Sequence, residues 1–289
     1  MRAMIKLKSS TLRKLEGSLF IAPWILGFLT FMLFPLGYSF YMSFHKFTIT
    51  TSGIKTQYNG LFYYKYILFE NPDMLYNQLI PFLRQAIIML PIIVVFSLLV
   101  AIMLNQKFRG RTFFRAIFFL PVIFTTGQVA AEFISQGEAN LDFLDRYNMS
   151  QIVVAYLPVA WSKPIVSILD SFVLILWYSG VQILIFLAGR QTISPSVYEA
   201  SRIDGASPWD TFWKITLPAM VPFILLNLIY TTVDLFTFPG NPILVQVNNT
   251  EYGRSSALAW IYFVIIFIFL GIIFLLFNRM FRTAPIENK

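Results

Sequence analysis

The sequence predicts an all-α membrane protein with six transmembrane helices and an amphipathic cytoplasmic loop between the fourth and the fifth. Two observations lead to this prediction. Hydrophobic residues make up 57% of the 289 residues and charged residues only 12%, whereas soluble domains are about one quarter charged. The apolar residues also gather into runs of about 20, the length that an α-helix needs to cross about 30 Å of hydrocarbon.

Six apolar runs are long enough to span a bilayer. The second and the sixth contain stretches without any charge, Ala86–Leu104 and Ser255–Asn278. The first is too long for the apolar part of a signal peptide and no small-residue cleavage site follows it, so we expect it to be retained as a helix. The third, fourth and fifth each contain one acid. The predicted spans are residues 17–44, 83–104, 116–134, 164–189, 219–238 and 255–278.

The distribution of basic residues predicts that both termini lie in the cytoplasm. Of the 22 Lys and Arg residues, fifteen lie in the two tails and in loops 105–115 and 190–218, and seven lie in the alternate loops. Cytoplasmic loops carry the excess of Lys and Arg in membrane proteins. Membrane topology therefore accounts for the net charge of +8, and we expect no nucleic-acid partner.

We expect the chain to have two parts. Residues 1–82 would form the N-terminal cytoplasmic tail, the first transmembrane helix and an external loop, and residues 83–289 a core domain of five helices that includes loop 190–218. The external loop is rich in aromatic residues, for which we favour a belt at the membrane surface over a ligand-binding box, because such belts are common. These residues are Phe62, Tyr63, Tyr64, Tyr66 and Tyr76.

Residues suited to catalysis are scarce. The chain has no cysteine and one histidine, His45, which excludes disulfides, thiolate sites and His-pair zinc sites. It also lacks the glycine-rich P-loop that cradles phosphates. We therefore predict no catalytic residue, no metal site and no cofactor bound by this chain.

Loop 190–218 contains the signals of two short helices. Ser-Pro pairs at 194–195 and 207–208 each offer an N-cap serine followed by proline at the first helical position. Gly205 stands between them, where a chain that reverses needs a residue that accepts a positive φ. We expect helices over residues 196–204 and 209–216.

The second of these helices, which we expect to end before Pro218, carries an aromatic stripe. Trp209, Phe212 and Trp213 recur at i, i+3 and i+4, the spacing of one helix face. Two uses remain open. The stripe could lie on lipid or on the transmembrane bundle, or the loop could dock to a protein. We favour docking, since the first helix carries charges of both signs, at Glu199, Arg202 and Asp204.

Two features of the chain carry a family resemblance. Glu199-Ala200-Ser201, Asp204-Gly205-Ala206, Phe212, Ile215, Leu217-Pro218 and Pro222 resemble the EAA motif of binding-protein-dependent ABC importer permeases, E-A-A-x-x-D-G-A followed by F-x-x-I-x-L-P-x-x-x-P. The one departure is Ser201, which stands where the motif has alanine. Residues 22–44 and 108–125 also resemble the first span and the entry to the third span of sugar permeases of the maltose and glycerol-phosphate type.

The resemblance implies a permease subunit, in the bacterial inner membrane, of an ATP-driven importer that moves a sugar or oligosaccharide inward by alternating access. In this family the EAA loop forms coupling helices that insert into a cleft of the cytoplasmic ATPase, which binds ATP and Mg²⁺. The implied partners are a second permease subunit, usually a different homologous chain, an ATPase dimer, an extracellular or periplasmic solute-binding protein and the lipid bilayer. The implied coupling residues are Glu199, Ala200, Ser201, Asp204, Gly205, Ala206, Phe212, Leu217 and Pro218.

Three acids inside the spans are candidates for a substrate pathway. Glu132, Asp170 and Asp234 fall in the outer third of their spans, and acids are costly inside a bilayer. They could line a water-filled vestibule and accept hydrogen bonds from sugar hydroxyls, although an acidic vestibule would disfavour an anionic substrate. Equally, they could be solvated at the headgroup level or lie beside basic residues such as Lys163. Further polar and aromatic candidates are Trp177, Tyr178, Gln182, Asn227 and Tyr230.

Three other functions compete with a sugar permease. Peptide or amino-acid ABC permeases share the EAA loop but usually not the first span. An ATP-independent channel or transporter would not need the loop. A membrane enzyme would need nucleophiles or metal ligands beside the acids, and the sequence offers none.

Overall fold

The structure, a computed structural model, is dominated by helices and divides into two compact units. The described residues are 9–50, 53–70, 75–106, 108–124, 149–158, 161–162, 165–166, 172–238, 241–247 and 251–281. Unit 1 comprises Met1–Pro72 and Val247–Ile261, and unit 2 comprises Asp73–Gln246 and Tyr262–Lys289. Within the described ranges, five helices are long and apolar enough to cross a membrane.

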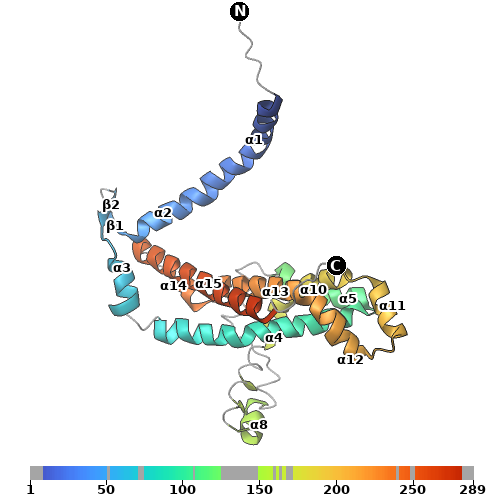
Figure 1. The fold of residues 1–289 in the computed structure, drawn as a ribbon. Helices are drawn as coiled ribbons and strands as arrows, with labels where there is room; N and C mark the ends of the chain where they lie inside the picture. Colours follow the sequence, from blue (N-terminus) through green and yellow to red (C-terminus); the bar gives the residue numbers. More distant parts are fainter. Residues whose placement is uncertain are drawn as a thin grey trace, which may run out of the picture. The chain divides into compact units, whose positions relative to one another are not determined.

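Unit 1 contains the first long helix and a β-hairpin (Figure 1). The helix consists of α1 (Ser9–Phe28), a π-helical segment η1 (Leu29–Leu33) and α2 (Phe34–Ser43). Strands β1 (His45–Thr50) and β2 (Gly53–Tyr58) pair antiparallel, with His45 opposite Tyr58. The short α3 (Phe62–Lys65) and the π-helical η2 (Tyr66–Glu70) follow. The sequence analysis had not predicted the hairpin.

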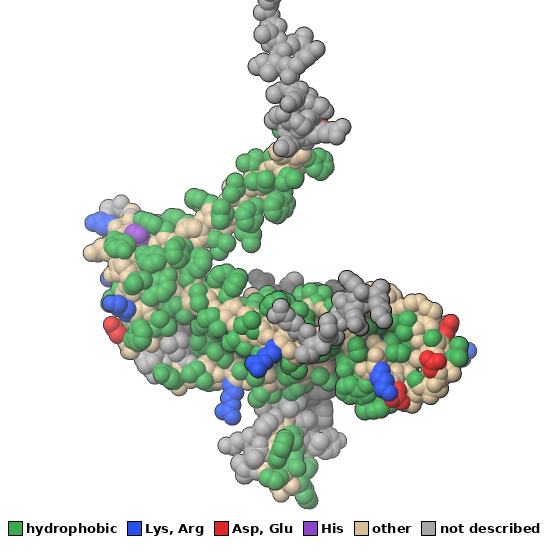
Figure 2. All heavy atoms as spheres, in the orientation of Figure 1, with side chains coloured by type: hydrophobic (Ala, Val, Ile, Leu, Met, Phe, Trp, Pro, Cys, Tyr) green, Lys and Arg blue, Asp and Glu red, His purple; other side chains and the backbone are tan. Residues whose placement is uncertain are grey.

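Unit 2 contains the helices that pack together. They are η3 (Leu75–Leu79), α4 (Ile80–Asn105), α5 (Arg111–Phe124), α8 (Met149–Tyr156), α10 (Phe172–Gln191), α11 (Pro195–Ile203), α12 (Pro208–Thr211), η4 (Phe212–Thr216), α13 (Leu217–Thr237) and α14 (Pro242–Val247). The last helix, α15 (Tyr252–Phe281), belongs to unit 1 as far as Ile261 and to unit 2 beyond it. Apolar side chains cover the long helices in Figure 2, while charged side chains gather around the hairpin and at the end that carries α11 and α12.

Helix α10 is central to unit 2, since it packs against α4, α5 and α13. The buried apolar side chains at this contact are Val94, Leu98, Ala101 and Leu104 of α4, Ile183, Phe186 and Leu187 of α10, and Met220 of α13. Gly189 of α10 lies so close to α13 that an added Cβ would lie 2.5–2.7 Å from three atoms of the Phe223 ring. Small residues allow such close approach between membrane helices, where packing rather than water exclusion holds helices together.

Three of the π-helical segments are explained by the prolines that follow them. Segments η1, η3 and η4 each end two residues before a proline, namely Pro35, Pro81 and Pro218. Proline lacks an N–H and its ring clashes with the carbonyl of residue i−4, and in each case that residue lies within the π-helical segment. The wider π-turn relieves the clash and lets the helix continue.

The predicted helix end before Pro218 is therefore wrong, because α12, η4 and α13 follow one another without a break. Five predicted spans lie on long helices of the structure; the fourth, 164–189, coincides with α10 from Phe172 onward, and most of its earlier residues lie outside the described ones. The third predicted span, 116–134, lies on α5 as far as Phe124 and then leaves the described residues. The six-helix count thus stays a prediction.

Candidate functional site

The loop between α10 and α13 forms the two capped helices that the Ser-Pro pairs predict. The Ser194 hydroxyl accepts a hydrogen bond from the Ser196 backbone N–H at 3.4 Å, and the Ser207 hydroxyl accepts one from the Asp210 N–H at 3.1 Å. Both caps supply an acceptor to N–H groups that have no partner within the helix. The predicted caps are confirmed, and α11 and α12 begin where they place them.

Helix α11 ends in a Schellman motif centred on Gly205. This residue has a φ of 75°, in the left-handed region that glycine adopts without steric cost. Its N–H donates to the Arg202 carbonyl at 3.1 Å, and the Ala206 N–H donates to the Ser201 carbonyl at 2.9 Å, which is the hydrogen-bond pattern of this motif. The predicted positive φ at Gly205 is confirmed.

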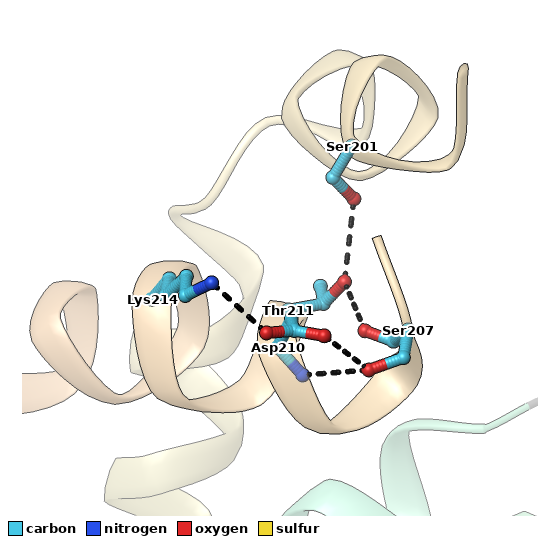
Figure 3. Close-up of polar contacts among 5 residues, drawn as sticks. All are labelled: Ser201, Ser207, Asp210, Thr211 and Lys214. Atoms are coloured by element: carbon cyan, nitrogen blue, oxygen red, sulfur yellow. Dashed lines mark hydrogen bonds and ion pairs between the residues drawn. The ribbon is translucent and has the colours of Figure 1, made fainter. Parts of the chain in front are cut away.

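Polar side chains join α11 to α12 (Figure 3). The Thr211 hydroxyl donates to the Ser207 carbonyl at 3.0 Å and lies 3.5 Å from the Ser201 hydroxyl. Ser207 also donates to the Asp210 carboxylate, which in turn pairs with the Lys214 ammonium at 2.9 Å. Ser201, the one departure from the EAA motif, is buried and contributes a hydrogen-bonding group to this link.

Tyr198 holds α11 to both flanking helical segments. The Arg190 guanidinium, at the end of α10, lies 3.9 Å above the centre of the Tyr198 ring, in cation–π geometry. The Tyr198 hydroxyl lies 3.1 Å from the Thr216 hydroxyl in η4. Neither contact was predicted, because both depend on residues distant in sequence that the fold brings together.

Replacing Tyr198 with leucine is expected to loosen α11. The substitution removes a cation–π contact and a hydrogen bond, each contributing about 1 kcal/mol. We expect backbone amides of 196–203 to exchange with deuterium about thirtyfold faster, as measured by hydrogen exchange with mass spectrometry. Tyr198→Phe keeps the ring and should show a smaller change. Unchanged exchange in the leucine variant would mean that these contacts do not hold the helix.

The outward surface of the loop exposes large apolar side chains. Ile203 and Trp209 are 86% and 70% exposed, and the rings of Trp209 and Trp213 meet edge to face at 5.5 Å. The described part of the chain therefore leaves much of the aromatic stripe uncovered. A cavity of about 490 Å³ lies beside it, lined by the end of α4, Arg190 and the loop helices.

The nine coupling candidates divide by burial. Leu217 packs against the core, Ser201 is buried, and Ala206 and Phe212 are partly buried. The surface of the loop is formed by the remaining candidates, which are exposed: Glu199, Ala200, Asp204, Gly205 and Pro218. The structure thus brings one set of candidates to the interior, where they hold the loop, and leaves the other accessible.

Two of the pathway candidates meet inside unit 2. Gln182 of α10 and Asn227 of α13 are fully buried. Gln182 Nε2 donates to the Thr231 hydroxyl at 3.1 Å, and Asn227 Nδ2 lies 3.5 Å from the Gln182 backbone carbonyl. Gln182 Oε1 and Asn227 Oδ1 accept no hydrogen bond from the described residues. Thr231 was missed, although a Thr-Thr pair in the middle of an apolar run is a detectable signal.

Three of the other pathway candidates lie near one another, since the Asp234 carboxylate interacts with Tyr178 and Tyr230 and also with the Gln182 side chain. The Tyr178 ring packs edge to face on Phe238 at 5.2 Å, Trp177 and Asp234 are partly buried, and Tyr230 is exposed. Glu132 and Asp170 lie outside the described residues. The described portion of the chain holds no cluster of three or more His, Cys, Asp or Glu side chains that could bind a metal ion.

Comparison with known proteins places the chain among transport components. Residues 71–284 match the family described as binding-protein-dependent transport system inner membrane component. A probable ABC transporter permease, YesP of Bacillus subtilis, is 30% identical over 96% of this chain and 93% of its own length. The lactose permease LacF of Rhizobium radiobacter is 28% identical over 75% of this chain and 72% of its own length. The trehalose/maltose permease MalF of Thermococcus litoralis is 26% identical over 92% of this chain and 94% of its own length.

Solved structures show the same fold. A bacterial ABC transporter involved in import of the acidic polysaccharide alginate aligns with a TM-score of 0.59 at 18% identity, covering 97% of this chain and all of that one. The same type of transporter in complex with an alginate-loaded periplasmic protein aligns at 0.61 with the same identity and coverage. The family match covers most of the chain, from before η3 to beyond the end of α15. This chain therefore belongs to the binding-protein-dependent transport system inner membrane components and is a multi-pass ABC transporter permease subunit, not itself an enzyme.

Proposed function

We propose that this chain imports a sugar or oligosaccharide as one permease subunit of an ATP-driven transporter in the bacterial inner membrane. Its relatives include permeases named for lactose, trehalose/maltose and arabinooligosaccharides, which supports a carbohydrate. The proposed chain has six transmembrane helices, with residues 83–289 as its core and 1–82 as an N-terminal extension. The excess of Lys and Arg in alternate loops supports a cytoplasmic location for both termini.

The α11–Gly205–α12 loop carries the proposal, because its exposed side chains and its connection to α13 suit a mechanical input. A partner that moved this loop would move α13 with it, since α12, η4 and α13 form a continuous helix. The partner is an ATPase dimer that binds ATP and Mg²⁺ in the cytoplasm. Its closure presses on the exposed candidates, and the helices alternate between inward-open and outward-open arrangements.

The substrate pathway runs beside the buried polar groups of unit 2. Gln182 Oε1 and Asn227 Oδ1 are buried acceptors without a donor among the described residues, and buried polar atoms normally find partners. A sugar hydroxyl would supply such a donor. We propose that these two residues, with Thr231, line the passage. The acids Glu132, Asp170 and Asp234 belong to its outer end, and Trp177, Tyr178 and Tyr230 to its aromatic walls.

Two further partners complete the importer. A second permease subunit, homologous to this one, forms the other half of the passage, and a solute-binding protein delivers the sugar from outside. The binding protein is supported by the alginate transporter that shares this fold, because its structure was solved in complex with a periplasmic protein carrying an alginate pentasaccharide.

Reversing the charge of Glu199 tests the proposal. Glu199 is exposed on α11, and a like-charge contact at an interface costs several kcal/mol. We expect Glu199→Lys to lower uptake more than about tenfold in cells that express the complete transporter. The measurement is accumulation of radiolabelled lactose, maltose, trehalose and arabinotriose, together with recovery of the ATPase subunits on affinity-purified permease.

The control is Glu70→Lys, an equal change at an exposed residue in the predicted external part of the chain, which should retain uptake and ATPase binding. Intact uptake in Glu199→Lys would refute coupling through this loop and favour an ATP-independent transporter. If wild-type cells accumulated none of the four sugars, a non-carbohydrate substrate would replace the sugar in the proposal.

A further inference from the structure

A second cavity, of about 320 Å³, lies within unit 1, far in sequence from the polar residues of α10 and α13. Three separate stretches line it: Lys46 in β1, then Asn59 to Tyr66, then Glu251 and Arg254 at the start of α15. The first turn of α15 sits directly on the end of α2, because a Cβ at Gly253 would collide with the His45 backbone carbonyl. Figure 1 shows these two helix ends meeting beside the hairpin.

Aromatic rings form one part of the cavity wall. Phe62, Tyr63 and Tyr66 all line it, and the rings of Phe62 and Tyr66 stack at 6.2 Å. These three belong to the group for which the sequence favours a membrane belt. Their neighbours here are charged and polar side chains rather than only apolar ones, which fits a ligand site better than a lipid-facing belt.

Charged groups of both signs complete the cavity. The Arg254 guanidinium is held in place by Glu251, at 3.7 Å, and by the Tyr66 ring, 5.4 Å from its centre. Lys46 also lines the cavity and has no carboxylate within ion-pair distance among the described residues. Asn59 adds an amide, so hydrogen-bond donors and acceptors stand side by side next to aromatic faces.

This combination matches a sugar ring better than a lipid headgroup. Each sugar hydroxyl both donates and accepts, which the Glu251 carboxylate, the two cations and the Asn59 amide can satisfy together. The C–H face of a pyranose can lie on an aromatic ring. A phosphate would meet the Glu251 charge in the same small space. The cavity volume is within the range of about 300–1,000 Å³ typical of small-molecule sites.

We infer that this cavity is a saccharide-binding site at the outer face, separate from the passage through unit 2, which holds one pyranose unit against Phe62, Tyr63 and Tyr66. The inference rests on the proposed function and on the proposed cytoplasmic location of both termini, which places these loops outside. Such a site would retain one unit of an oligosaccharide at the outer face.

Saturation-transfer NMR on the complete transporter in nanodiscs, without binding protein, tests this site. The probes are lactose, trehalose and an alginate trisaccharide. We expect transfer to the ring protons of at least one probe, about fivefold weaker binding in Tyr66→Ala through the lost aromatic contact, and a similar loss in Lys46→Gln. Lys46 is exposed, so its substitution leaves folding intact. Tyr76→Ala, which removes an exposed tyrosine outside the cavity, should bind like wild type.

Each other outcome overturns the inference. No transfer to any probe, or equal transfer in wild type and both cavity variants, would show that the cavity holds no sugar. Loss of the signal when phosphatidylglycerol replaces phosphatidylcholine in the nanodisc would identify a lipid headgroup as the occupant. The uptake measurement is independent, so intact wild-type uptake without probe binding refutes only the outer site, whereas absent uptake refutes the transport proposal.

Discussion

A Gly205→Pro transporter is expected to reach the membrane but not to accumulate sugar. Proline fixes φ near −65°, whereas Gly205 has a φ of 75° and donates its N–H to Arg202 at 3.1 Å. The substitution therefore breaks the Schellman motif and separates α11 from α12. Two lost hydrogen bonds contribute about 2 kcal/mol, which lowers the fraction of correctly formed loop by a factor of about 30.

The matched control is Gly205→Asn, because asparagine tolerates the left-handed region better than other non-glycine residues and no atom lies within 4 Å of a Cβ at this position. We expect it to retain most of the uptake. The measurement combines sugar accumulation with ATPase activity of the purified complex, in which Gly205→Pro should lose the stimulation by loaded binding protein. Full uptake in the proline variant would contradict the proposed role of the loop.

Gly189→Leu is expected to prevent stable folding of unit 2. A Cβ at this position would lie 2.5–2.7 Å from the Phe223 ring, and the remaining leucine atoms would extend further into α13. Overpacking of a core typically costs about 1–3 kcal/mol. Here the added side chain would force α10 and α13 apart, and these two helices form the centre of the unit. We expect a loss of monodisperse protein on size exclusion in detergent and a lower thermal unfolding temperature.

Two variants separate this effect from a general cost of leucine in a membrane helix. Gly271→Leu makes the same change in α15 at a position where no atom lies within 4 Å of the added Cβ, and should behave like wild type. Phe223→Ala should partly rescue Gly189→Leu, because neighbouring substitutions are not additive. Equal behaviour of the leucine variants at 189 and 271 would show that α10 and α13 do not depend on this contact.

Local features of the fold could be predicted because their causes lie within a few residues. An apolar run of about 20 residues specifies a membrane helix by length alone, and the structure places α4, α13 and α15 on such runs. The caps at Ser194 and Ser207 depend on side chains that bond to backbone groups two or three residues away. The turn depends on the positive φ that Gly205 adopts without steric cost. For the same reason, the motif residues of the loop could be placed before the structure was known.

Features that depend on distant residues could not be predicted. The contact of Arg190 with Tyr198 and the burial of Gln182 against Thr231 require α10 to lie beside the loop and beside α13. The first strand of the hairpin carries the polar–apolar alternation that marks strands, from Lys46 to Thr50, but this stretch was interpreted as part of an external loop. Proline at 218 was read as a helix end, whereas the π-turn before it lets the helix pass through. Which candidates line the pathway likewise depends on packing.

In the proposed mechanism, the uninterrupted helical path from Pro208 to Thr237 would act as a lever. It contains 30 residues and is therefore about 45 Å long at 1.5 Å per residue. Trp209 and Asp234 stand near its two ends, roughly 38 Å apart. Tilting this rod by about 10° at the Trp209 end would swing the Asp234 end sideways by roughly 7 Å. A small change of angle at the Trp209 end, in the loop, would thus set the width of an opening at the Asp234 end, on the opposite side of the membrane.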